Sequence, residues 1–220
     1  MKITCVIPAY NEAKNISLVV SGVRPFVDEV VVVDDCSRDD TFDLAKQAGA
    51  IVFRHPLNRG QGAALQTGND YALEHQADII VHFDADDQFL ASEIKDMVAP
   101  ILAGRADIVF GSRFLGKKSN LPTFKKYLIM PLARLFTRVI LGIKLSDPQN
   151  GFRALSQAAA RRIRINNRGM AHNSEIQIKA FQEKLRIAEV PITVVYHHFG
   201  QKLAGGFKVI RDLLIHKIIK

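Results

Sequence analysis

Three aspartates lie in the segment HFDADDQF, residues 82–89, which directly follows the apolar run 79–81. Asp84 and Asp86 are two residues apart, so in an extended segment both carboxylates face the same side, and Gln88 continues this spacing. Carboxylate and amide oxygens are ligands that Mg²⁺ and Mn²⁺ prefer. We therefore predict that Asp84, Asp86 and Gln88 hold one of these cations. The alternative is that the aspartates only form a turn or cap a helix.

Short runs rich in Val and Ile alternate with amphipathic stretches along the first hundred or so residues, which is typical of βαβ units around a parallel sheet. The predicted strands are 2–8, 29–35, 50–54, 77–86, 106–112, 151–156 and 186–196, and the predicted helices are 12–24, 38–48, 61–76, 91–103, 173–184 and one beginning near residue 206. The helix at 38–48 is expected to begin with the capping sequence Ser37-x-x-Asp40.

The polar segments that follow three of these strands form the candidate site, because ligands bind at the carboxyl ends of the strands in an open parallel sheet. These segments are 8–12, 34–37 and 84–88. Two of them are acidic and would repel a phosphate directly. A divalent cation between the acids and a diphosphate removes this conflict.

The composition is that of a single soluble domain, with 220 residues, 48% of them hydrophobic and 24% charged. Cys5 and Cys36 lie in or beside predicted inner strands, which favours buried reduced thiols and a cytoplasmic location. The longest apolar stretch, 128–145, is interrupted by Pro131 and by basic residues, so we expect no membrane-spanning helix.

Positive charge is concentrated in the second half of the chain. Residues 1–100 carry 8 Lys or Arg against 16 Asp or Glu, whereas residues 101–220 carry 22 against 6. This asymmetry predicts a polyanionic partner, such as a phosphate, an anionic lipid or a nucleic acid. The segments 117–145 and from about 206 also have amphipathic patterns, which predict docking on an anionic membrane surface, with core-facing helices as the alternative.

Seven motifs occur in order over most of the chain, and together they resemble the family 2 glycosyltransferases of GT-A fold, especially the dolichyl- and polyprenyl-phosphate sugar synthases. The motifs are VIPAYNE (6–12), VVVDDCS (31–37), NRGQGAALQTG (58–68), FDADDQ (83–88), GSRF (111–114), DPQNGFR (147–153) and EVPI (189–192). The resemblance implies an α/β domain over 1–220, with a mostly parallel, Rossmann-like GT-A sheet flanked by helices. It also implies a nucleotide-sugar-binding half, 1–112, and an acceptor- and membrane-facing half, 113–220.

The resemblance assigns roles to individual residues. Asp35 matches the carboxylate that reads the nucleotide base, and Asp34 is expected to cap a helix instead. Arg113 matches a cation near the phosphates, and no acid lies near it in the sequence. Asp86 and Arg113 are the candidate catalytic residues, and the loop 58–62 matches a contact to phosphate or sugar. The positions that match contacts to the nucleotide sugar are Pro8, Tyr10, Glu12, Val33, Asp35, Asp84, Ala85, Asp86, Gln88 and Arg113.

The implied reaction is inverting transfer of a hexose from a UDP- or GDP-linked donor to a polyprenyl phosphate. A metal neutralises charge on the departing diphosphate. A phosphate acceptor is already ionised at neutral pH, so it requires no general base. The candidates for binding the acceptor phosphate are Arg153, Arg168, His197, His198 and Lys202.

Other interpretations stay open at this point. A transferase that acts on a hydroxyl of a saccharide or protein would use Asp87, Glu175 or a histidine as general base. A nucleic-acid-binding module would explain the basic half, but its basic residues alternate with Leu, Ile and Phe rather than with surface aromatics, so we predict no nucleic-acid partner. We expect peripheral association with the inner face of the membrane. A membrane-protein partner is left open, because many members of the family carry C-terminal membrane helices that this chain lacks.

Overall fold

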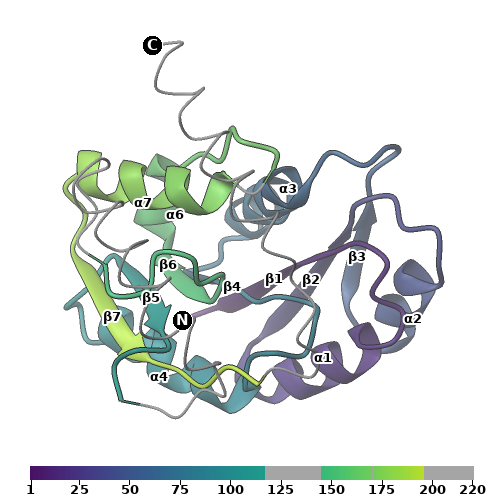
Figure 1. The fold of residues 1–220 in the computed structure, drawn as a ribbon, viewed down its shortest axis with the longest axis horizontal. Coiled ribbons are helices and arrows are strands. Elements are labelled where there is room, and N and C mark those ends of the chain that lie inside the picture. Colours follow the sequence, from purple (N-terminus) through teal and green to yellow (C-terminus); the bar gives the residue numbers. More distant parts are fainter. Residues whose placement is uncertain (117–144, 170, 196–220) are drawn as a thin grey trace, which may run out of the picture.

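The computed structural model describes residues 1–116, 145–169 and 171–195 (Figure 1). The strands are β1 (Ile3–Ala9), β2 (Glu29–Asp34), β3 (Ile51–Arg54), β4 (Ile79–His82), β5 (Ile108–Ser112), β6 (Arg153–Ser156) and β7 (Ile187–Pro191). The helices are α1 (Ile16–Val23), α2 (Thr41–Gln47), α3 (Gln61–Glu74), α4 (Ile94–Leu102), α6 (Gln157–Arg162) and α7 (His172–Gln182), with 3-10 turns η1 (Arg24–Phe26) and η2 (Ala91–Glu93).

One seven-stranded sheet has the order β3-β2-β1-β4-β6-β5-β7. Its described strands run parallel except for β6, which pairs antiparallel with both β4 and β5. The chain builds from β1 outward to β3 and then crosses to the other side of β1 with β4. The region at the carboxyl ends of β1 and β4, called the crevice below, is therefore the switch point at which such sheets bind ligands.

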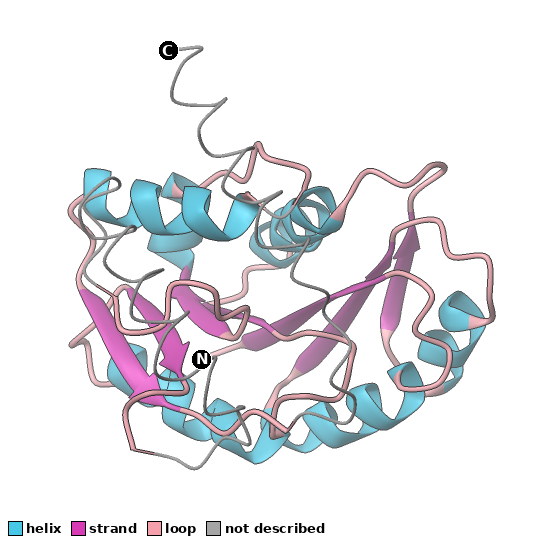
Figure 2. Ribbon diagram, in the orientation of Figure 1, coloured by secondary structure: helices cyan, strands magenta, loops and turns pink. Residues whose placement is uncertain are grey.

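Helices cover both faces of the sheet, α1, α2 and α4 on one face and α3, α6 and α7 on the other (Figures 1 and 2). Strands that are buried on both faces need apolar residues at successive positions, which explains the continuous Val and Ile runs of β1 and β2. The predicted α/β fold, a mostly parallel sheet flanked by helices, is confirmed.

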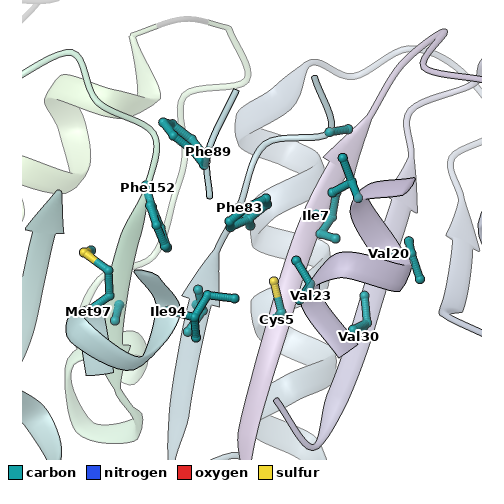
Figure 3. Close-up of a cluster of buried hydrophobic side chains, with 14 of the residues drawn as sticks. Cys5, Ile7, Val20, Val23, Val30, Phe83, Phe89, Ile94, Met97 and Phe152 are labelled. Atoms are coloured by element: carbon teal, nitrogen blue, oxygen red, sulfur yellow. The ribbon is translucent and has the colours of Figure 1, made fainter. Parts of the chain in front are cut away.

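The core on the α1 and α4 face joins both helices to the sheet and includes three phenylalanines (Figure 3). The ring centroids of Phe83 and Phe152 lie 5.1 Å apart, and those of Phe89 and Phe152 lie 5.2 Å apart. Phe83 and Phe89 flank the acidic segment 84–88, so both ends of this segment are anchored in the core. This anchoring limits how far the acidic loop can move.

Several predicted boundaries differ from the structure. The predicted capping sequence Ser37-x-x-Asp40 does not cap the helix. Helix α2 begins at Thr41, and its N-cap Asp40 makes no side-chain capping hydrogen bond. The Ser37 hydroxyl accepts from the Asn11 backbone amide instead. Helix α6, which is capped by the Ser156 hydroxyl, was not predicted. The two cysteines are free thiols, as expected; Cys5 is buried, whereas Cys36 is only half-buried.

The segments predicted to dock on a membrane, 117–145 and from about 206, lie outside the described residues apart from Leu145, which is buried. Within the described ranges, every helix is too short or too polar to cross a bilayer. The docking prediction therefore stays a prediction.

Gly68 allows α3 to lie close to β1, and this contact can be tested. A Cβ at position 68 would lie 2.2 Å from Cγ1 of Val6. We expect Gly68→Ala to lower the free energy of unfolding by about 1–3 kcal/mol through overpacking. Gly22→Ala in α1 is the matched control, because its nearest neighbour would be Ala91 at 3.9 Å. Urea denaturation of both variants makes the comparison, and equal stability of the two would contradict the close packing.

Candidate functional site

The acidic segment after β4 forms a turn. The strand ends at His82, residues 85 and 86 are in a turn, and Asp87 has a positive φ of 58°. The expectation that Asp84 and Asp86 share a side because the segment is extended is therefore wrong. They are nevertheless close enough for the charge of Asp86 to raise the pKa of Asp84. The turn, rather than strand alternation, brings them together.

Asp84 is held from two sides. The Gln61 side-chain amide donates to Asp84 Oδ1 at 3.0 Å, and a Cβ at Gly151 would lie 2.5 Å from Asp84 Oδ2. Burial and the charge of Asp86 raise the pKa of the Asp84 carboxyl to about 7, although the positive charge of Arg153 opposes this shift. Asp84 is therefore positioned in a place where its negative charge is poorly compensated.

Glu12 adds a third carboxyl group to this edge of the sheet. Burial raises its pKa and the nearby charges of Asp86 and Asp39 add to that, whereas a hydrogen bond from Asn15 lowers it. Mutually repelling carboxylates at one edge are what a divalent cation would neutralise. The loop after β1 thus supplies charge to the same place as the loop after β4.

The residues present fit Mg²⁺ or Mn²⁺ held partly by a substrate. No group of three or more His, Cys, Asp or Glu side chains among the described residues forms a metal site. Mg²⁺ is commonly bound through one or two carboxylates, with substrate phosphates and waters completing its coordination. Asp84 and Asp86 supply that number of carboxylates. The backbone N–H of Gln88 donates to Asp86 Oδ1 at 3.2 Å, so the Gln88 backbone lies beside Asp86, and the role of its side chain as a metal ligand stays a prediction.

Hydrogen bonds join the loop after β1 to the loop after β2, and the two loops form one side of the crevice. The Asn11 side chain accepts from the Arg38 amide, and the Thr41 hydroxyl accepts from the Glu12 amide at 2.8 Å. Tyr10 is 43% exposed at this edge, where its ring is accessible to a ligand. The polar segments 8–12 and 34–37 therefore lie together, as the candidate site requires.

Three further residues that were predicted to contact the nucleotide sugar are buried, namely Pro8, Val33 and Ala85. The Val33 side chain packs with Ala64 of α3 in the core, and its contact with the nucleotide sugar stays a prediction. Ala85 is 4% exposed, so its side chain offers a ligand little surface, and any close approach would be to its backbone.

Asp35 anchors a loop from the next part of the chain. Its Oδ1 accepts from the Arg59 amide at 2.8 Å and lies 2.7 Å from His55 Nδ1, and its Oδ2 accepts from the Gly60 amide at 2.6 Å. His55 also contacts the Thr67 hydroxyl through Nε2 at 2.9 Å. The base-reading role of Asp35 stays a prediction, and the structure adds that this carboxylate holds the loop 58–62. Asp34 accepts from the Ser37 amide, which is a turn rather than a helix cap.

Arg113 is paired with an acid. Its Nε donates to Asp147 Oδ2 at 2.6 Å and its Nη2 donates to Asp147 Oδ1 at 2.7 Å. No acid lies near Arg113 in the sequence, but the fold brings Asp147, 34 residues away, into contact with it. The pair joins the GSRF and DPQNGFR motifs beside the crevice. Paired charges bind a further anion less strongly than a single cation does.

Arg153 is fully buried, which corrects its prediction as a direct contact to the acceptor phosphate. Its guanidinium donates to the Asn150 and Gly151 carbonyl oxygens and to the Asn173 side chain, and Nη1 has no partner among the described residues. Burial lowers its pKa to about 10, and the charge of Asp84 raises it. Arg153 thus lies behind Asp84 as an internal counter-charge.

Two buried histidines, which the sequence did not single out, surround this guanidinium. Burial lowers the pKa of His172 to about 4, with a further contribution from Arg153. Burial also lowers the pKa of His82, and Arg153 and His172 lower it further. Both rings are therefore neutral near pH 7. No sequence signal distinguishes them from surface histidines, because burial is what sets their charge.

The remaining acceptor candidates differ in what the structure shows. Arg168 is exposed on the loop before α7. His197, His198 and Lys202 lie outside the described residues. Glu175, one of the bases considered for a hydroxyl acceptor, accepts from the Asn166 and Asn167 amides and from Lys179, so it stabilises this loop.

Comparisons with known proteins agree with this geometry. The chain is 33% identical to the UDP-N-acetylglucosamine--dolichyl-phosphate N-acetylglucosaminyltransferase of Methanococcus voltae, over 98% of this chain and 96% of that protein. It is also 33% identical to the undecaprenyl-phosphate mannosyltransferase of Micrococcus luteus, over 94% of this chain and 89% of that protein. The glucosyl-3-phosphoglycerate synthase of Mycobacterium tuberculosis, solved with Mn²⁺ and UDP-glucose, superposes with a TM-score of 0.75 at 25% identity, over 97% of this chain and 76% of that chain.

The sequence profile described as Glycosyl transferase family 2 matches residues 4–164, which include the crevice loops, the acidic turn and Arg153. The match spans more than half of the chain, and the TM-score of 0.75 to the Mycobacterium tuberculosis synthase shows a similar fold. The chain therefore belongs to glycosyl transferase family 2 and is a glycosyltransferase of GT-A fold.

Proposed function

We propose that this glycosyltransferase moves a hexose from a nucleotide diphosphate sugar to a polyprenyl phosphate, with inversion at the anomeric carbon. The observation that carries the proposal is the acidic turn, where Asp84 and Asp86 repel each other at the switch point of the sheet. The names of two relatives that are each 33% identical support a polyprenyl phosphate as acceptor. The donor, the metal and the membrane face are part of the proposal.

Different residues around the crevice would bind different parts of the donor. Asp84 and Asp86 would hold a Mg²⁺ or Mn²⁺ ion, which neutralises the charge that develops on the departing diphosphate. The hydrogen-bonded loops after β1 and β2 would bind the nucleoside of the donor. Arg113 lies beside the crevice, where its pairing with Asp147 fixes the orientation of the guanidinium. Fixed groups of this kind need no rearrangement when charge develops.

The acceptor phosphate attacks through one of its oxygens. A bond forms between this oxygen and the anomeric carbon, and the bond from that carbon to the diphosphate breaks, so the electron pair leaves with the nucleoside diphosphate. No proton moves, because the attacking oxygen is already ionised. We further propose that the segments 117–145 and from about 206 bring the enzyme to the inner face of an anionic membrane, where the acceptor lies.

Substrate identity is tested with a panel of UDP- and GDP-linked hexoses and N-acetylhexosamines against undecaprenyl and dolichyl phosphates. Lipid-linked sugar is the readout, and the same donors are offered 3-phosphoglycerate as a hydroxyl acceptor. We expect product with a lipid phosphate, and chelation of divalent cations should abolish it. Product only with the hydroxyl acceptor would refute the proposed acceptor class.

Asp86→Asn tests the metal site. We expect it to reduce turnover at least about 100-fold, because a metal ligand is lost at the point where charge develops. The fold should stay intact, since the residue lies at the rim of the sheet. Asp43→Asn removes an exposed carboxylate from α2 and is the matched control. Undiminished turnover of Asp86→Asn, or of the wild type in excess chelator, would exclude the metal site.

The pKa of Asp84 predicts a pH-dependent stability for the metal-free protein. The folded-state pKa, about 7, lies above the ordinary value of 3.8, so the contribution of Asp84 to the free energy of unfolding falls as pH rises between these values. Asp84→Asn keeps the side chain neutral. We expect it to be more stable than the wild type at pH 8 by about 2 kcal/mol, after allowance for solvent screening, and nearly equal to it near pH 4. Chemical denaturation in chelator measures this.

Adding Mg²⁺ at pH 8 is the companion measurement. The ion should stabilise the wild type, because it neutralises the Asp84 charge, and should stabilise Asp84→Asn much less. Other groups titrate between pH 4 and pH 8, so the comparison with Asp84→Asn isolates this carboxyl: equal stability of the two proteins at pH 8 without metal would contradict the electrostatic account of the acidic turn.

Asp87→Asn tests whether a general base is needed. Asn tolerates the positive φ of this position, so the substitution should not disturb the turn. With a polyprenyl phosphate as acceptor we expect turnover to stay within about threefold of the wild type, far less than the loss of a general base produces. A loss of several orders of magnitude with unchanged donor affinity would favour a hydroxyl acceptor.

A further inference from the structure

We infer that Arg59 and Arg168 together bind the phosphate group of the acceptor. This inference rests on the proposed function. Arg59 lies in the loop between β3 and α3, and Arg168 lies in the loop before α7; both are exposed. No carboxylate among the described residues pairs with either one. They are separated by more than one hundred residues in the sequence, so only the fold brings them together.

Backbone contacts join the two loops directly beside these arginines. The Gly62 amide donates to the Arg168 carbonyl oxygen at 3.1 Å. A Cβ at Gly60 would lie 2.1 Å from that same oxygen, and a Cβ at Gly62 would lie 1.9 Å from the Asn167 carbonyl oxygen. The contact therefore depends on glycine at both positions. The backbone of Gly60, which directly follows Arg59, therefore lies against the backbone of Arg168.

Each loop is also held from behind. The Asp35 carboxylate accepts from the Arg59 and Gly60 amides, and the Glu175 carboxylate accepts from the Asn166 and Asn167 amides. These hydrogen bonds are made by the backbone of the loops, and Arg59 and Arg168 remain exposed to solvent. Two cations on fixed loops bind an anion with less loss of conformational freedom than cations on mobile loops do.

The arginine pair lies at the edge of the metal site. Gln61, which follows Gly60, donates its side-chain amide to Asp84. An anion held by Arg59 and Arg168 would therefore be close to the group that is transferred. Two like-charged substrates repel each other at this distance, so a second cationic group is required besides the metal.

The other arginines predicted to contact phosphate are already engaged. Arg113 forms a two-bond ion pair with Asp147, and Arg153 is buried behind Asp84. The donor diphosphate has the acidic turn and its cation. Among the residues that the structure describes, Arg59 and Arg168 are therefore the cations left for the acceptor phosphate, and guanidinium groups match its geometry.

The test uses Arg59→Gln, Arg168→Gln and the double variant in the full chain. Arg105→Gln, an exposed arginine ahead of β5 at the opposite edge of the sheet, is the control. Binding of a short-chain isoprenyl phosphate is measured by calorimetry in Mg²⁺, and binding of UDP and GDP is measured separately. We expect each single variant to weaken isoprenyl phosphate binding about tenfold.

The double variant should lose less than the product of the two single effects, because both groups donate to one phosphate. Nucleotide affinity should be unchanged, and Arg59→Lys and Arg168→Lys should each recover part of the loss. Unchanged isoprenyl phosphate binding in both single variants would overturn the inference, and so would weakened nucleotide binding, which would assign the pair to the donor. Turnover tells the two hypotheses apart: if the wild type binds the isoprenyl phosphate but transfers no sugar to it, the proposed function fails while the site stands.

Discussion

Repulsion between carboxylates at the end of β4 is the constraint on which the other features of the crevice depend. Asp84 cannot move away from Asp86, because Phe83 and Phe89 anchor the turn in the core and Gly151 packs against the carboxylate. The protein offsets this charge only in part, through Gln61 and the buried Arg153. This uncompensated charge is the reason why we propose that a divalent cation, and through it a diphosphate, binds here. The same repulsion destabilises the metal-free fold above neutral pH.

The buried guanidinium of Arg153 is the positive charge that partly offsets the Asp84 carboxylate from inside the protein. Burial of His82 and His172, together with the charge of Arg153, lowers the pKa of both rings and keeps them neutral, so Arg153 is the local positive charge behind Asp84. Neutral rings fill space near Arg153 without adding charge that would repel a metal. Removing either the acid or the arginine alone would leave the other charge buried and poorly compensated.

Motifs far apart in the chain form two cross-links beside the metal site. Asp35 holds the loop 58–62, which in turn contacts the loop that carries Arg168. Arg113 and Asp147 tie the end of β5 to the segment before β6. The loops that we propose to bind the donor and the acceptor therefore share supports.

The sequence by itself determined the sheet, the family and the edge at which the site lies. The Val and Ile runs specify strands buried on both faces, and polar segments directly after them must gather at one edge, because parallel strands end together. Only the tertiary structure decided what each side chain does there. Arg113 meets an acid 34 residues away, Arg153 is buried, and the loop after Arg59 contacts the loop that carries Arg168. Charge pairing and burial depend on contacts between distant segments, and local periodicity carries no information about them.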